Sequence, residues 1–191
     1  MQKPKLKEIF TIPNILSMFR IVLLPLIVWF FVCKEDHVKA IIVLLISGLS
    51  DILDGFIARK FNMISNFGKI LDPVADKLTQ GVLLICLIFK HTQVLLILGV
   101  FVLKEFIMIM MGYMIIKRKN LVNSAKWYGK LNTVIIYSVI FFMIILPDIS
   151  EMYVNVMVFV CTSMIIIAFI MYVNFYKNIL SSEKKNNGIE C

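Results

Sequence analysis

Four aspartates place two pairs of carboxylates at helical spacing in the first half of this chain. Asp51 and Asp54 are three residues apart, and Asp72 and Asp76 are four residues apart. Residues at these spacings share one face of an α-helix. Both pairs fall in or beside long apolar runs, where a charged group is costly unless it faces water, a partner or a metal ion. The two pairs are therefore candidates for one functional site.

Carboxylates without a nearby His or Cys are typical ligands of a hard divalent cation. We therefore predict that Asp51, Asp54, Asp72 and Asp76 bind Mg²⁺ or Mn²⁺. Two such ions would balance four negative charges, and a two-metal site suits in-line displacement at phosphorus. A single aspartate could instead pair with a lysine or serve packing, but four together favour the metal site.

The elements that must position these carboxylates are two apolar helices joined by a short connection, which makes them antiparallel neighbours. Asp51 lies eight residues from Arg59, and Asp76 lies eight residues from Gly68. At about 1.5 Å per residue, both aspartates are about 12 Å from the connection. We expect the two pairs to face each other at one depth. Pro73 indicates the first turn of the second helix.

Small residues accompany the aspartates. Gly55 and Gly68 leave room beside the carboxylates for a bulky ligand, and Ala58 keeps the same face narrow. Arg59, one turn further out, can bind a phosphate. Glycine is also a common packing residue in membrane helices, so the two glycines alone do not decide between these roles.

The composition predicts a membrane protein. The chain has 191 residues, 60% of them hydrophobic, and its mean hydropathy is +0.91. A soluble domain with a buried core does not have this composition, whereas runs of about 20 apolar residues span a bilayer as helices. We predict an all-α, polytopic membrane protein with six transmembrane helices, at about 12–33, 38–60, 69–89, 92–116, 127–147 and 152–176.

The net charge of +8 could indicate nucleic-acid binding, but the distribution of the basic residues indicates topology instead. Most of them lie at the N-terminus, in the second and fourth connections and at the C-terminus, which share one side of a six-helix chain. The opposite side has Lys34, Lys39 and Lys90. The positive-inside rule then places both termini in the cytoplasm of an integral cell-membrane protein. We predict no nucleic-acid partner.

The remaining features are simple. The four cysteines are isolated, so they predict neither a disulfide framework nor a metal site. The basic N-terminus precedes an apolar run without a small-residue cleavage site, so we expect the first helix to be retained. We predict one membrane domain over residues 1–180 and a disordered tail over residues 181–191.

Residues 51–76 contain the pattern D-x-x-D-G-x-x-A-R, then eight residues, then G-x-x-x-D-x-x-x-D. This resembles the signature of the CDP-alcohol phosphotransferase family, including its spacing, and the six-helix plan extends the resemblance over nearly the whole chain. In that family, a CDP-linked lipid or alcohol donates a substituted phosphoryl group to a hydroxyl acceptor and CMP leaves. The resemblance implies a divalent-metal-dependent transferase of phospholipid biosynthesis with its active site at the cytoplasmic face.

The same resemblance implies roles for individual residues. Asp51, Asp54 and Asp72 would be metal ligands, and Asp76 would be both a ligand and the base that takes the acceptor's proton. The donor would be bound by a set of residues around the first pair: Asp51, Gly55, Ala58, Arg59 and Gly68. The family also implies a homodimer.

The stretches Ile12–Ile21 and Leu71–Lys77 resemble the phosphatidylglycerophosphate synthase branch. That branch transfers the phosphatidyl group of CDP-diacylglycerol to glycerol 3-phosphate. An anionic acceptor requires cationic partners, and Arg20, at the predicted depth of the aspartates, is our first choice. Arg20 could instead pair with Glu105 or with an aspartate of the cluster. All the candidates for binding the acceptor phosphate are Arg20, Lys104, Lys117, Arg118 and Lys130.

Two departures from the branch pattern keep other acceptors open. Lys104 precedes Glu105 where the branch has Arg, and Asn132 replaces the second Lys of a Gly-Lys-x-Lys-Thr run. Lysine cannot make the bidentate phosphate contact of arginine. Cardiolipin synthases of the same family, which use phosphatidylglycerol as acceptor, are therefore the main alternative, followed by enzymes that use serine or inositol phosphate.

Two classes outside the family are less consistent with the sequence. An ion-coupled transporter predicts acidic groups spread across the bilayer, whereas these four lie near one face. An intramembrane prenyltransferase also has Asp-rich motifs with Mg²⁺, but on distant helices of a longer chain. Here both pairs lie within 26 residues.

Overall fold

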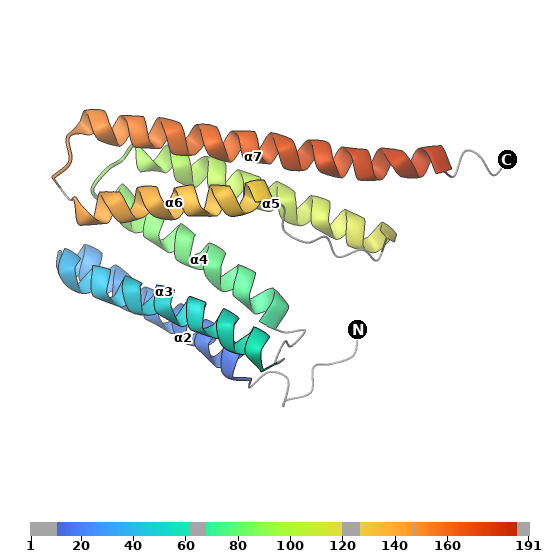
Figure 1. Ribbon diagram of the computed structural model, residues 1–191. Helices are drawn as coiled ribbons and strands as arrows, with labels where there is room; N and C mark the ends of the chain where they lie inside the picture. Colours follow the sequence, from blue (N-terminus) through green and yellow to red (C-terminus); the bar gives the residue numbers. More distant parts are fainter. Residues whose placement is uncertain (1–10, 62–67, 120–126, 147, 187–191) are drawn as a thin grey trace. The chain divides into compact units, whose positions relative to one another are not determined.

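The computed structural model describes residues 11–61, 68–119, 127–146 and 148–186. Throughout this described part of the chain, the regular structure is helical (Figure 1). The all-α prediction is therefore confirmed. The chain forms two compact units, residues 1–90 with 144–147 and residues 91–143 with 148–191, and each unit is described by itself.

The first unit contains α2 (Ile12–Val28), the π-helical turn η1 (Trp29–Cys33), α3 (His37–Lys60) and α4 (Gly68–Ile88). Pro13 lies in the first turn of α2, where its missing N–H costs no helical hydrogen bond. The helix α3 begins with a side-chain cap, because the Asp36 carboxylate accepts a hydrogen bond of 3.0 Å from the Lys39 backbone N–H. Only three residues separate η1 from α3, so α2 and α3 form a tight helical hairpin.

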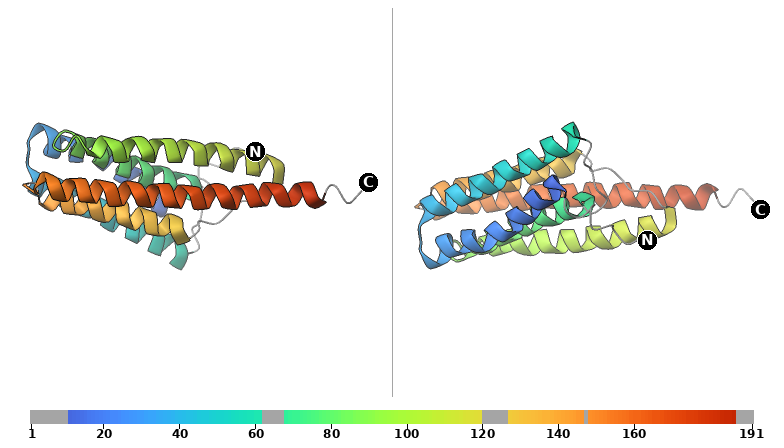
Figure 2. Two further views of the ribbon diagram at one scale, coloured as in Figure 1. Left: turned by 90° about the horizontal axis from the view of Figure 1, so that it is seen from above. Right: turned by 90° about the horizontal axis from the view of Figure 1, so that it is seen from below.

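The helix α2 is the centre of the first unit, because it packs against both α3 and α4. Figure 2 shows α2 running beside α3 within this unit. Its buried apolar residues include Leu23, Leu24 and Ile27, while Leu83 and Leu84 of α4 are also buried. The two aspartate-bearing helices therefore share α2 as a common packing partner.

The structure differs from the sequence prediction in the position of Pro73. The helix α4 begins at Gly68, so Pro73 lies inside it rather than in its first turn. A proline ring at this position removes one backbone hydrogen bond to the preceding turn. The predicted span at 69–89 nevertheless agrees with α4 to within one residue at each end.

The second unit contains α5 (Val94–Lys119), α6 (Trp127–Ile145) and α7 (Glu151–Asn186), with the last two residues of α6 assigned to the first unit. The helices α5 and α7 pack side by side (Figure 1). Residues 181–186, predicted to begin a disordered tail, continue α7 as helix. No Gly or Pro interrupts residues 151–187, so nothing in the sequence ends the helix earlier.

Four segments of the described residues are long and apolar enough to cross a membrane. Large apolar side chains remain exposed on them, such as Val22, Leu49 and Phe159 at 66, 59 and 72%, which suits a surface in contact with lipid. This is a membrane protein. The helix α4 is not one of the four because its first half contains four charged residues, Lys69, Asp72, Asp76 and Lys77. The helix α6 has a shorter apolar stretch, Gly129–Ile145. The four segments are Ile12–Cys33, His37–Ile57, Val94–Gly112 and Glu151–Lys177.

Candidate active site

A serine of α2 joins the two aspartate pairs. The Ser17 hydroxyl lies 2.6 Å from Asp72 Oδ1 and 3.1 Å from Asp54 Oδ2, within hydrogen-bonding distance of both carboxylates. Asp54 belongs to α3 and Asp72 to α4. Ser17 of α2 therefore links a carboxylate of α3 to a carboxylate of α4.

An arginine of the same helix neutralises the first pair. The Arg20 Nη2 donates to Asp51 Oδ1 and, over 3.1 Å, to Asp54 Oδ2. The side chains of Arg20 and Asp54 are only 3% and 5% exposed, whereas that of Asp51 is 52% exposed. A buried ion pair of this kind requires its partners, because removing one leaves an uncompensated charge. The sequence analysis left open whether Arg20 pairs with an aspartate of the cluster. The structure contains this ion pair, with Asp51 and Asp54.

The second pair has its own polar partner. Gln80, one turn after Asp76 on α4, donates through Nε2 to Asp76 Oδ2 over 3.2 Å. Asp76 is half-buried, and Gln80 is fully buried. This contact restrains the carboxylate for which the family resemblance implies the role of base.

Sequence reasoning missed Ser17 and Gln80. Asn14, Ser17 and Arg20 are spaced three residues apart on α2, and all three are buried. Polar residues at this spacing form a stripe on one face of an otherwise apolar helix. The sequence analysis had placed Arg20 of this helix at the site, and the stripe could have extended that prediction to Asn14 and Ser17.

The predicted donor-binding residues are placed only in part. Gly55 is half-buried on α3, and Gly68 is buried as the first residue of α4. Ala58 and Arg59 lie on the last turn of α3, but their side chains are outside the described residues.

Among the acceptor candidates, Arg20 alone belongs to the first unit. Its Nε is buried and has no hydrogen-bond acceptor among the described residues. In the second unit, Lys104 is buried and contacts the adjacent Glu105 over 2.8 Å, and Lys130 is exposed. Lys117 and Arg118 lie on α5 with side chains outside the described residues. Arg20 therefore keeps one buried N–H group without an acceptor among the described residues.

Asn132 occupies the position of the second lysine in the Gly-Lys-x-Lys-Thr run of the phosphatidylglycerophosphate synthase branch. Its side chain is buried, since the residue is only 2% exposed. Neither polar atom of its side chain has a hydrogen-bond partner within the described part of the chain. It lines a pocket of about 150 Å³ between α6 and α7 whose other lining residues are apolar. A buried amide therefore replaces a charge at this position.

The donor atoms of the cluster fit a hard cation, since Ser17 and the aspartates offer only oxygen. Within the described residues, however, no group of three or more His, Cys, Asp or Glu side chains is arranged to hold a metal ion. The cation that lies among the carboxylates in this arrangement is the Arg20 guanidinium.

A family model for CDP-alcohol phosphatidyltransferases matches residues 10–173, which include α2 through most of α7. The chain belongs to this family of membrane transferases, as the resemblance of its aspartate motif implied. The matched segment contains all four aspartates as well as Ser17 and Arg20.

Curated relatives include proteins with two different names. A CDP-diacylglycerol–glycerol-3-phosphate 3-phosphatidyltransferase of Aquifex aeolicus is 38% identical over 127 residues, which cover 65% of this chain and 70% of that protein. One of the same name from Rickettsia bellii is 40% identical over 41% of this chain and 45% of its own length. A cardiolipin synthase (CMP-forming) of Streptomyces coelicolor is 46% identical over 37% of this chain and 35% of that protein. The alignment thus spans less than half of the latter two relatives.

Proposed function

We propose that this chain transfers the phosphatidyl group of CDP-diacylglycerol to glycerol 3-phosphate and releases CMP. The observation that supports it most is the contact of the Ser17 hydroxyl of α2 with a carboxylate of each aspartate pair, within a chain of the CDP-alcohol phosphatidyltransferase family. The names of the relatives from Aquifex aeolicus and Rickettsia bellii favour this acceptor. One membrane domain over residues 1–180 would carry the activity.

In this proposal, Asp51, Asp54, Asp72 and Asp76 bind Mg²⁺ or Mn²⁺, with two ions expected. The bound ions would supply a Lewis acid for the phosphate oxygens and lower the pKa of the acceptor hydroxyl. Asp51, at the exposed edge of the cluster, also contacts the donor, together with a group of residues near the ends of α3 and α4: Gly55, Ala58, Arg59 and Gly68.

The chain's own residues then divide the reaction between them. Asp76 accepts the proton of the acceptor hydroxyl, and Gln80 orients its carboxylate. The acceptor oxygen forms a bond to the phosphorus that carries diacylglycerol, and the bond from that phosphorus to the CMP oxygen breaks. Arg20 holds the phosphate of glycerol 3-phosphate through its unsatisfied Nε. The other candidates for binding the acceptor phosphate remain those predicted from the sequence: Lys104, Lys117, Arg118 and Lys130.

We further propose six transmembrane helices, with both termini and the active site at the cytoplasmic face of the cell membrane. The distribution of Lys and Arg between the two sides supports this orientation. The acyl chains of the donor would stay in lipid while its pyrophosphate reaches the aspartates. A homodimer is proposed from the family resemblance.

The second candidate is cardiolipin synthesis, with phosphatidylglycerol as the acceptor. The name of the Streptomyces coelicolor relative favours it. The pairing of Lys104 with Glu105 and the buried Asn132 favour it as well, because both reduce the positive charge available to an anionic acceptor.

The test is CMP release from CDP-diacylglycerol by the purified protein with Mg²⁺ or Mn²⁺. Glycerol 3-phosphate, phosphatidylglycerol, serine and inositol phosphate would be compared as acceptors. Release that depends on glycerol 3-phosphate is expected. Release with phosphatidylglycerol alone would establish the second candidate, and no release with any acceptor would contradict phosphatidyl transfer itself.

A further inference from the structure

A second polar site lies at the other end of the first unit. A pocket of about 380 Å³ is lined by residues from the end of α2, the start of α3 and the end of α4. Pockets for small ligands begin at about this size. Its six lining residues are Phe31, Val32, Glu35, His37, Phe89 and Lys90.

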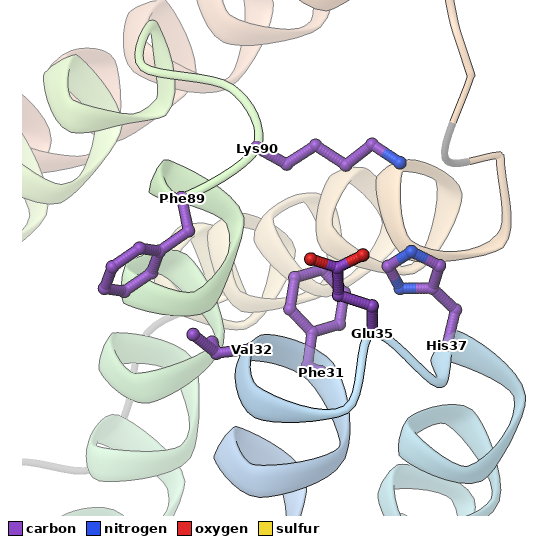
Figure 3. Close-up of a pocket in the computed structure, with 6 residues that line it drawn as sticks. All are labelled: Phe31, Val32, Glu35, His37, Phe89 and Lys90. Atoms are coloured by element: carbon purple, nitrogen blue, oxygen red, sulfur yellow. The ribbon is translucent and has the colours of Figure 1, made fainter.

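The lining has a polar half and an apolar half. Figure 3 shows the Glu35 carboxylate, the His37 imidazole and the Lys90 ammonium gathered on one side, with Phe89 and Val32 on the other. Phe31 is buried and packs edge-on against the His37 ring at 5.0 Å between centroids. The pocket therefore suits an amphipathic ligand with charges of both signs.

Two unusual backbone features meet at this pocket. The five residues Trp29–Cys33 form a π-helical turn at the end of α2, and such turns are rare and frequent at functional sites. Glu35 has a φ of 51°, the left-handed region that favours glycine. A non-glycine residue in this conformation motivates a search for function. Here the conformation brings the Glu35 carboxylate to the pocket wall.

One polar atom of the lining is unsatisfied. His37 Nδ1 is buried and has no hydrogen-bond partner among the described residues. In the tautomer that protonates it, this nitrogen donates a hydrogen bond. A ligand with an anionic oxygen would satisfy it, and the Lys90 ammonium would add a charge-assisted contact.

The pocket also lies at a membrane boundary. It is formed where the membrane-crossing segments Ile12–Cys33 and His37–Ile57 meet. Trp29, which begins the π-helical turn, is 55% exposed, and exposed tryptophans are enriched at the level of lipid headgroups. Lipid headgroups are therefore the ligands that this pocket meets at the highest concentration.

We infer that the pocket lined by Glu35, His37 and Lys90 binds the zwitterionic headgroup of a membrane lipid that carries a phosphate and a primary ammonium. The ammonium donates hydrogen bonds to Glu35 and lies near the Phe31 ring. The phosphate accepts from His37 and Lys90, and the glycerol and first methylenes contact Val32 and Phe89. This site is separate from the aspartate cluster and does not depend on the proposed transferase activity.

The experiment uses the full chain in nanodiscs of phosphatidylcholine with a small fraction of phosphatidylethanolamine, and native mass spectrometry counts the lipids retained. Phosphatidylcholine has the same charges but no ammonium N–H. Because a hydrogen bond to a charged group contributes about 1.5–3 kcal/mol, we expect about tenfold enrichment of phosphatidylethanolamine. Glu35→Gln should remove the enrichment, and Glu151→Gln, an exposed acid in the second unit, should retain it.

Glu35→Gly separates binding from backbone conformation. Glycine adopts a φ of 51° without strain, so this variant should keep the wild-type melting temperature or exceed it while losing the enrichment. A second experiment replaces phosphatidylethanolamine with phosphatidylglycerol in the nanodiscs. Wild type and Glu35→Gln should retain phosphatidylglycerol equally. Equal retention of phosphatidylethanolamine by wild type and Glu35→Gln would overturn the inference. So would displacement of the lipid by soluble phosphoethanolamine, which would assign the pocket to a free metabolite.

Discussion

The two ends of the first unit hold charged groups in different ways. At the aspartate end, Asp54 and Arg20 are almost fully buried and joined to each other. At the pocket end, Glu35 is exposed and is positioned by its own backbone conformation. The aspartate cluster is built from side chains within three helices, α2, α3 and α4. The pocket is built from residues at the ends of the same helices.

This difference shows where substitutions should be most damaging. A buried charge depends on its partner, because desolvation is costly when the partner is lost. An exposed charge at a helix end is stabilised by water as well. Substitutions at Ser17, Arg20 or Asp76 should therefore have larger effects than substitutions at Asp36, near the pocket.

The largest expected effect is that of Asp76→Asn. The amide cannot accept the acceptor's proton, so turnover should fall by about 10²- to 10⁴-fold. Binding of CDP-diacylglycerol should remain measurable. CMP release under saturating substrates and a donor-binding titration would test this, with Glu151→Gln as the control. Full activity of the Asp76→Asn variant would show that Asp76 is not the base.

Arg20→Ala should weaken acceptor binding more than donor binding. Loss of a charge-assisted contact to phosphate should raise the KM for glycerol 3-phosphate about 10- to 100-fold, with a much smaller change for CDP-diacylglycerol. Steady-state kinetics with each substrate varied in turn would measure both. Arg20→Lys, which keeps the charge but loses the planar donor group, should be intermediate. Equal changes for both substrates would give Arg20 a purely structural role.

Ser17→Ala tests the link between α3 and α4. It removes the hydroxyl that contacts both Asp54 and Asp72, so we expect a loss of about 2 kcal/mol and a melting temperature lower by about 5 °C. Thermal unfolding in detergent would measure this loss. Ser50→Ala is a matched control, because the hydrogen bond of the Ser50 hydroxyl in the described part of the chain goes to the Ile46 carbonyl of its own helix. If both variants melted alike, Ser17 would not join the helices.

The smallest expected effect concerns the cap of α3. Asp36→Ala removes the acceptor of the Lys39 backbone N–H, so the melting temperature should fall slightly, whereas Asp36→Asn should retain the cap. Contacts with Lys39 lower the pKa of Asp36 below 3.8. The charged form therefore stabilises the fold above that value, and its contribution is lost as the pH falls further. Thermal scans from neutral to acidic pH would show no such loss in Asp36→Asn.

Much of the fold could be predicted from the sequence, because apolar runs and short connections locate helices in a membrane protein. All six predicted spans overlap observed helices, and the span at 38–60 agrees with α3 to within one residue. The predicted last span, 152–176, agrees with the apolar segment Glu151–Lys177, whereas the helix itself continues to Asn186. Its apolar composition stops well before its helical propensity does, so residues 181–186 were assigned to a tail.

The candidate site was predicted less completely. The spacing of Asp51, Asp54, Asp72 and Asp76 was sufficient to indicate a site on two helices. It could not show that a third helix lies against both of them, because helix packing depends on shape across the interface rather than on periodicity. Ser17 was therefore missed, although it is three residues from Arg20.

We propose that the aspartates joined by α2 are a divalent-cation site. The most direct measurement is a Mn²⁺ titration of the purified protein followed by electron paramagnetic resonance. Wild type and Glu151→Gln should each bind up to two ions, and the double variant Asp54→Asn, Asp72→Asn should bind none at the same concentrations. Undiminished Mn²⁺ binding by that double variant would contradict the account.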